Sequence, residues 1–277
     1  MPAKSVLGYV DRPGFLHRVS GLSKLMLAVA SVVGALVGFD ARYLAAMLVL
    51  NIVLWVLSRV KLRDLAVVLV IIAGLMLLNN VFIFLFAPGY GTELYGTRTV
   101  LVNGPWHWDI TSEQLFYQLV VTLKYFAVLP PVLLFIATTR PPEFAQSLNR
   151  IGIPYKIAYS VSIALRYIPD IQRDFVTISK AHQARGLETS SKAGIATRAR
   201  NIVGVIIPLL LGAFDRIEEV ASAMELRGFG RGKRRTWYGK KPLTWRDWLI
   251  MALSFAVLAV PIVLAIVNGG RFWNPFA

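Results

Sequence analysis

Long apolar runs separated by short polar segments set the pattern of this chain. Five runs stand out, at residues 23–37, 43–57, 65–87, 115–138 and 249–267. A helix needs about 20 apolar residues to cross a hydrocarbon core ~30 Å thick. The third run has 23 residues without a charge. The pattern predicts an all-α, polytopic membrane protein with about five transmembrane helices.

Residues 139–248 follow a different pattern, in which polar and apolar positions recur at helical spacing. Arg140-Pro141-Pro142-Glu143 begins a short amphipathic helix. Two long helices are predicted after it, at about 170–186 and 200–228, with Pro169 where a first turn tolerates proline. The second helix carries an apolar stripe at intervals of four and three residues, which favours packing across another helix: Leu210, Phe214, Ile217 and Ala221.

The polar break at 88–113 predicts an irregular loop. Residues 99–102 favour a strand and precede Asn103-Gly104, a dipeptide typical of hairpin turns. Thr111 and Gln114 have the spacing of a capping box at the start of the fourth run, with Gln114 reaching back to the cap.

A few polar residues interrupt the apolar runs. Asn79 and Asn80 fit either a bond to a neighbouring helix or a substrate contact. Lys124 fits either a buried functional cation or a side chain that snorkels to the surface. Pro130-Pro131 should kink the fourth helix.

Charge assigns sides to these segments. The formal charge is +15. Lys and Arg minus Asp and Glu give +3 at 1–24, +2 at 58–64, −2 at 88–114 and, from 19 against 9, +10 at 139–248. This alternation is the positive-inside pattern and not a nucleic-acid footprint. It predicts a cytoplasmic N-terminus and, after five spans, a C-terminus outside.

The predicted organisation is therefore a membrane region of four helices at 1–138, a helical cytoplasmic coupling domain at 139–248 and a last transmembrane helix at 249–277. The extracytoplasmic loop is 88–113. With no cysteine and three dispersed histidines, we expect no metal site in this chain.

Both long helices are predicted to end in arginine followed by glycine, Arg185-Gly186 and Arg227-Gly228. One such ending is ordinary helix termination. Two of them, 42 residues apart and each with alanine four residues before the arginine, are less ordinary. Small alanines admit a partner surface, and a guanidinium pairs well with a carboxylate. The predicted docking residues are Ala181, Ala184, Arg185, Gly186, Glu225, Leu226, Arg227 and Gly228.

Several stretches resemble one transporter family over nearly the whole chain. They are Leu16-His17-Arg18 with Ser23-Lys24-Leu25, Arg166-Tyr167-Ile168-Pro169, and both arginine-glycine endings. The chain resembles the transmembrane T component of energy-coupling factor (ECF) transporters. Ala184-Arg185-Gly186 fits the family motif, whereas the second ending has Leu226 where the family more usually has alanine.

The resemblance implies a coupling subunit without catalysis, in the plasma membrane of a prokaryote. Its two helix ends would dock into grooves on two ATPase subunits, which hold ATP and Mg. A separate substrate-binding membrane subunit, the S component, would pack on it and reorient to import a vitamin or a metal ion. We expect the apolar stripe to pack against that subunit. The chain itself lacks a phosphate-binding loop, because Gly232-Lys233 has Arg227 where the first glycine belongs.

Two alternatives stay open on the sequence. A conventional ABC permease is faintly suggested by Glu219-Val220-Ala221, although that design uses one docking loop. An intramembrane enzyme acting on lipid phosphates would need Asp170 and Asp174, one helical turn apart, to share a metal.

Overall fold

The computed structural model describes residues 14–104, 108–186, 194–232, 237 and 242–276. Within these ranges the chain is helical apart from one two-stranded sheet, which confirms the all-α class. Its contacts group the chain into two compact units. We call residues 1–143 with 241–277 the membrane unit, and residues 144–240 the crossed-helix unit.

Four helices of the described chain are long and apolar enough to cross a membrane: α3 (Ala41–Ser58), α4 (Ala66–Phe86), α6 (Ser112–Thr138) and α10 (Trp245–Val267). A fifth apolar helix, α2 (Gly21–Val37), has 17 residues. Large apolar side chains cover the outward faces of these helices. Lipid is the environment in which such faces and fully bonded helical backbones are stable, so the chain is a multi-pass membrane protein.

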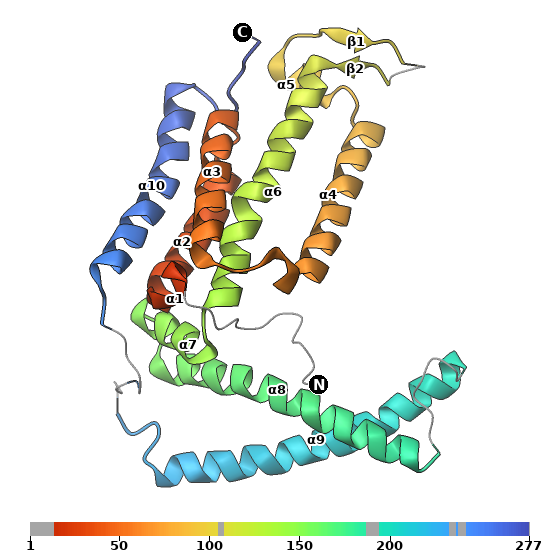
Figure 1. The fold of residues 1–277 in the computed structure, drawn as a ribbon, viewed down its shortest axis with the longest axis vertical. Helices are drawn as coiled ribbons and strands as arrows, with labels where there is room; N and C mark the ends of the chain where they lie inside the picture. The colour runs from red at the N-terminus through yellow and green to blue at the C-terminus, as the bar shows by residue number, and fades with distance from the viewer. Residues whose placement is uncertain (1–13, 105–107, 187–193, 233–236, 238–241, 277) are drawn as a thin grey trace. The chain divides into compact units, whose positions relative to one another are not determined.

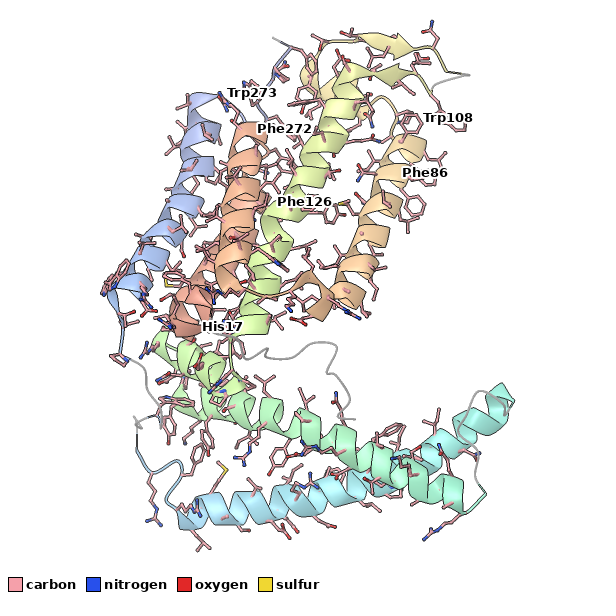
Figure 2. All side chains as sticks on the ribbon, viewed as in Figure 1. His17, Phe86, Trp108, Phe126, Phe272 and Trp273 are labelled. Carbon is pink, nitrogen blue, oxygen red and sulfur yellow. The ribbon has the colours of Figure 1, made fainter. Side chains whose placement is uncertain are left out.

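Short elements connect these helices. They are α1 (Phe15–Arg18), a 3-10 turn (Leu62–Asp64), α5 (Tyr90–Tyr95), β1 (Val100–Val102) and β2 (Ile110–Thr111). Helix α6 is central, because it packs against α2, α3, α4 and α5, while α10 packs along α2 (Figure 1). Trp108, Phe272 and Trp273 lie at one end of the unit and His17 at the other (Figure 2).

Asn51 of α3 compensates for two prolines in the middle of α6. A proline has no N–H for the carbonyl four residues earlier, so Pro130 and Pro131 leave two α6 carbonyls without helical partners. These carbonyls belong to Phe126 and Ala127. The Nδ2 of Asn51 donates to both, at 2.8 and 3.2 Å. Since a bilayer offers no water to such carbonyls, this amide satisfies the α6 backbone and fixes α3 against it.

The carboxylate of Asp247 joins the start of α10 to the start of α2. Its Oδ2 accepts from the N–H and hydroxyl of Thr244, both at 2.7 Å, and completes a capping box. Its Oδ1 accepts the Ser20 N–H at 2.6 Å and the Ser23 hydroxyl at 3.0 Å. One buried acidic side chain therefore bonds two helix N-termini that lie far apart in the sequence.

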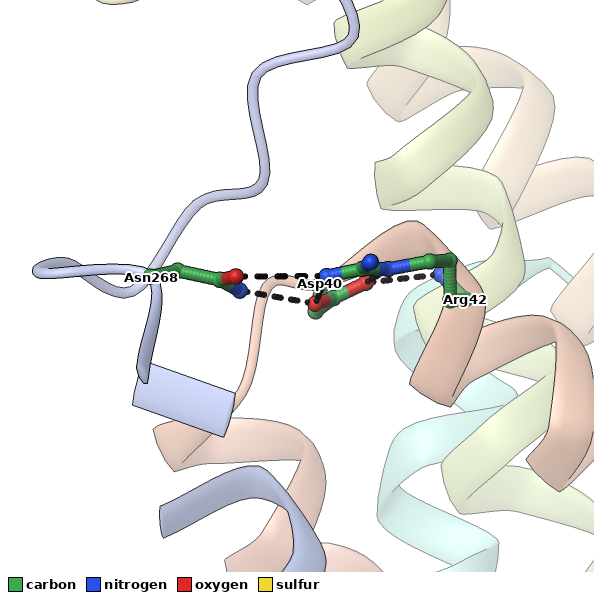
Figure 3. Close-up of polar contacts among 3 residues, drawn as sticks. All are labelled: Asp40, Arg42 and Asn268. Atoms are coloured by element: carbon green, nitrogen blue, oxygen red, sulfur yellow. Dashed lines mark hydrogen bonds and ion pairs between the residues drawn. The ribbon is translucent and has the colours of Figure 1, made fainter. Parts of the chain in front are cut away.

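At the opposite end, Asp40 ties the turn between α2 and α3 to the chain beyond α10. Its carboxylate accepts from the Arg42 side chain at 2.9 Å and from Asn268 Nδ2 at 2.9 Å (Figure 3). Burial raises the pKa of Asp40, but the hydrogen bonds from Arg42 and Asn268 outweigh it, so the pKa lies below its ordinary value. The rings of Phe39 and Phe272 stack beside them, with centroids 4.6 Å apart.

The loop before α6 matches its prediction only in part. Strand β1 pairs antiparallel with β2, as the hairpin chemistry predicted. Thr111 Oγ1 accepts from the Gln114 N–H at 3.3 Å, as a helix cap should. The side chain of Gln114 does not reach back, however, because its Oε1 accepts from the Gly91 N–H at 2.8 Å. The predicted capping box is therefore only half formed, since the neighbouring backbone at Gly91 is packed against Gln114.

Asn80 and Lys124, two of the polar residues within the spans, contact neighbouring elements. Asn80 Nδ2 donates to the Thr122 hydroxyl at 3.3 Å, and Gln118 donates to the Asn80 carbonyl at 3.2 Å, so these contacts join α4 to α6. The Lys124 ammonium lies 3.2 Å from the centroid of the Phe39 ring. This contact at the α2–α3 turn favours the snorkelling interpretation of Lys124.

The crossed-helix unit contains most of α7 (Pro141–Arg150), then α8 (Tyr155–Ala184) and α9 (Ile195–Leu226). Both long helices begin earlier than predicted, at 155 and not about 170, and at 195 and not about 200. Helix α8 continues through Pro169 because its side chains pack on both sides of the proline. Tyr159 lies 5.0 Å from the ring of Phe229, and beyond the proline Asp174 bonds α9. Tertiary packing here overrides the local cost of proline.

Replacing Asn51 with leucine should destabilise the membrane unit by about 2 kcal/mol, because the α6 carbonyls lose their donor. Unfolding of the purified chain by SDS or heat in detergent measures the change. Asn79→Leu is the matched control, since Asn79 bonds no described residue, and should cost less than about 0.5 kcal/mol. Equal losses in the two variants would contradict the assigned role of Asn51.

Candidate functional site

The C-terminal end of α8 carries the first predicted docking site. Arg185 caps the helix, and its N–H donates to the His182 carbonyl at 3.1 Å. Gly186 follows with φ +84° and donates to the Gln183 carbonyl at 3.0 Å. Gly186 thus adopts the left-handed conformation that ends many helices, which a side chain would strain. Ala181, Ala184, Arg185 and Gly186 are all exposed.

The end of α9 has the same design with one difference. Gly228 has φ +68° and donates to the Glu225 carbonyl at 2.9 Å, while Phe229 donates to Met224 at 2.9 Å. These two bonds are those of a Schellman motif. Arg227 caps the helix and is exposed, and Leu226 beside it is 90% exposed. Leu226 therefore adds exposed apolar area at an otherwise polar helix end.

The two helices cross, and their C-terminal ends lie at opposite ends of the pair (Figure 1). Gly204 of α9 faces His182, close to Arg185, since a methyl group added at Gly204 would lie 3.7 Å from the His182 ring. Arg227 is 227 − 204 = 23 residues further along α9. At 1.5 Å per residue, the two arginine-glycine ends are roughly 35 Å apart. The structure therefore presents two separate ends and not one composite site.

An ion pair bridges the crossing. The Arg216 guanidinium donates to the Asp174 carboxylate at 2.8 Å, and both side chains are partly exposed. The hydrogen bond and charge of Asp174 raise the pKa of Arg216 above its ordinary value. Asp170 lies 3.7 Å from Arg173. Both carboxylates that the lipid-phosphate enzyme would require for a metal are thus paired with arginines.

The apolar stripe on α9 is not packed within the described protein. Phe214 is 63% exposed and Ile217 62%, and Leu210 is 52% exposed. Helix α8 contacts α9 through the neighbouring face that carries Arg216, which leaves the stripe uncovered. The stripe predicts that Phe214 and Ile217 pack either within the protein or against a substrate-binding subunit. Their exposure leaves packing against another subunit as the prediction.

Sequence reasoning missed a cavity next to this stripe. It has a volume of about 620 Å³ and lies between the N-terminal part of α8 and the C-terminal part of α9. Phe229 closes one end, with its ring 5.7 Å from Tyr155 and 5.0 Å from Tyr159. Its lining includes Ile163, Tyr167, Ile217, Ala221 and Met224. The sequence signal that could have indicated this cavity is Phe229, which directly follows Arg227-Gly228. A Schellman motif often places an apolar contact at this position.

Fold and site define an all-helical, multi-pass membrane protein with a polar unit that presents two exposed helix ends. The family profile described as cobalt transport protein matches residues 14–238. The chain is 30% identical over 261 residues to the energy-coupling factor transporter transmembrane protein EcfT of Brevibacillus brevis, covering 91% of this chain and 94% of that relative. The EcfT of Exiguobacterium sibiricum is 28% identical over 271 residues, 95% of this chain and 98% of its own length.

The chain therefore belongs to the cobalt transport protein family and is the transmembrane T component of an ECF transporter. A shorter match of 164 residues, 37% identical, relates it to the EcfT of Limosilactobacillus fermentum, over 55% of this chain and 60% of that protein. The relatives are named as transmembrane components, which points to a non-catalytic subunit that works in a complex with others.

Exchanging the charges of the crossing pair tests whether it holds α8 to α9. Asp174→Arg or Arg216→Asp alone should speed amide hydrogen exchange around residue 216 by no more than about fivefold, because an exposed pair contributes little. The double exchange should restore the original rate. Arg173→Asp serves as control, since Arg173 is exposed and its ion pair is with Asp170 of its own helix. If the double variant exchanged amide hydrogens around residue 216 faster than either single variant, the assigned pairing would be overturned.

Proposed function

We propose that this T component couples two ATPase subunits to a substrate-binding membrane subunit, the S component. The ends of α8 and α9 are the docking elements, each received by a groove on one ATPase. The observation that carries this proposal is the pair of exposed ends, capped by Arg185 and Arg227 and stopped by glycines in the left-handed conformation. Their separation of roughly 35 Å suits two separate receptors better than one.

The chemistry of each end suits a protein groove with an acidic residue. Ala181 and Ala184 leave the last turn of α8 narrow, so a partner surface can approach the backbone closely. Arg185 can then form two parallel hydrogen bonds to a carboxylate. The end of α9 differs, because Leu226 adds apolar area beside Arg227. We infer that the first end relies more on close packing and the second on burying Leu226.

The uncovered stripe supports a place for the S component. Leu210, Phe214, Ile217 and Ala221 form an exposed apolar strip on α9, bordered near its C-terminal end by the exposed Asp215, Glu218 and Glu219. Burial of such a strip against another apolar surface contributes about 25 cal/mol per Å². The strip borders the cavity through Ile217 and Ala221, so a partner side chain inserted there would contact both helices.

Charge supports an orientation with the N-terminus in the cytoplasm and the C-terminus outside. Among the described residues of the membrane unit, one end carries seven basic residues: Arg18, Lys24, Arg59, Lys61, Arg63, Arg140 and Arg246. The end with the β-hairpin carries three, Arg42, Arg98 and Arg271, and Lys124 of α6 contacts Phe39 there as a fourth. An excess of Lys and Arg marks the cytoplasmic side. The complex would lie in the plasma membrane of a prokaryote.

ATP and Mg belong on the ATPase subunits in this proposal, because the sequence has no phosphate-binding loop. The T component receives movement from them and passes it to the S component. The cargo, a vitamin or a metal ion, would be recognised by the S component.

Replacing both Arg185 and Arg227 with glutamate should release the ATPase subunits, because each end would then set a carboxylate against the expected acidic partner. Affinity purification of the complex, followed by subunit stoichiometry, measures the loss. Each single variant should weaken retention less than the double. Arg173→Glu, an exposed charge reversal in mid-α8, is the control and should leave stoichiometry unchanged. Intact stoichiometry in the double variant would refute the docking role.

A further inference from the structure

An apolar groove runs between α3, α4 and α6 in the membrane unit. Its volume of about 410 Å³ falls within the ~300–1,000 Å³ of typical ligand sites. Both α3 and α4 pack on α6, and the groove lies between them. Apolar side chains line almost all of it, including Ile52, Val56, Leu69, Ala73, Met76 and Leu129. Its walls are membrane-spanning helices, so its natural occupant is a molecule of the bilayer.

The length of the groove fits one leaflet. Along α3 the lining extends from Leu48 to Val56, eight residues and about 12 Å at 1.5 Å per residue. Half of a ~30 Å hydrocarbon core is about 15 Å. At its shallow end the lining includes Leu62, which belongs to the loop between α3 and α4. The groove therefore spans one leaflet and opens at that loop.

Basic residues adjoin Leu62 in the loop at this end of the groove. Arg59, Lys61 and Arg63 flank Leu62, and all three are exposed. None of the three forms an ion pair with a described residue, in contrast to Arg42 and Arg98 at the other end. Arg59 also adopts φ 57°, the left-handed conformation that favours glycine. Arg59 therefore occupies a position where glycine would cost less strain.

We propose that this groove binds an anionic phospholipid of the leaflet that faces residues 58–64. One acyl chain lies in the groove against α4 and α6, and the phosphate headgroup contacts Arg59, Lys61 and Arg63. The apolar walls of the groove favour binding of the acyl chain, and the three basic residues favour a negatively charged headgroup. Lipid in this position would hold α4, which carries no buried side chain of its own, against the rest of the unit.

The full-length chain in detergent, supplied with phosphatidylglycerol or with phosphatidylcholine of the same acyl chains, tests the proposal by native mass spectrometry. The unmodified chain should retain one phosphatidylglycerol with at least about tenfold preference, because each basic residue strengthens binding to an anionic surface about fivefold. Arg59→Gln, Lys61→Gln and Arg63→Gln together should remove the preference. Circular dichroism checks that each variant remains helical.

A second pair of variants separates the groove from general lipid contact. Ala73→Phe fills the groove and should reduce phosphatidylglycerol retention at least about fivefold. Gly74→Phe adds the same ring next to it, where no other atom lies within 4 Å, and should leave retention unchanged. Equal retention of the two lipids by the unmodified chain would overturn the proposal. So would equal effects of the two phenylalanines, or an Ala73→Phe variant that loses a partner membrane subunit while its lipid retention is unchanged.

Discussion

The membrane unit depends on the hydrogen bonds from one amide, Asn51, to two carbonyls of α6. Within a bilayer every backbone polar group has to find a partner inside the protein, and Pro130 and Pro131 remove two of the donors that α6 would otherwise supply. Helix α6 is also the element on which α2, α3, α4 and α5 pack. The same contact that satisfies α6 therefore sets where α3 lies. Asp247 and Asp40 then fasten α10 to α2 at its two ends.

The crossed-helix unit differs from the membrane unit, because much of its apolar surface is exposed. Its helices are amphipathic and exposed, and their contacts include the Asp174–Arg216 ion pair, the Arg216 guanidinium over the Tyr167 ring and the aromatic ring of Phe229. This packing leaves polar helix ends and an apolar stripe uncovered. In a T component of an ECF transporter, these are the surfaces on which other subunits would be expected to assemble. The membrane unit satisfies its own polar groups, whereas this unit leaves its apolar surface for partners.

Long uncharged runs predicted the spans, because a bilayer demands such runs and the requirement is local in the sequence. The glycines predicted the helix stops at Gly186 and Gly228 for a similar reason, since the left-handed conformation is a property of single residues. The prediction that a helix begins after Pro169 was wrong, because packing of Tyr159 and Asp174 on either side of the proline keeps α8 continuous. The sequence pattern also could not predict the hydrogen-bond partners of Asn51 and Gln114, because they depend on which elements become neighbours. The cavity beside Phe229 depends on the same tertiary arrangement.

The central claim is that the ends of α8 and α9 each contact an ATPase subunit. Site-specific photo-crosslinking in the assembled complex tests it most directly, with the photoreactive amino acid placed at position 184 in one sample and at position 226 in the other. Mass spectrometry then identifies the linked protein. The account predicts cross-links to an ATPase subunit from both positions, and none from a control at position 173 in mid-α8. Cross-links from positions 184 and 226 to lipid or to membrane subunits, with no ATPase among the products, would contradict it.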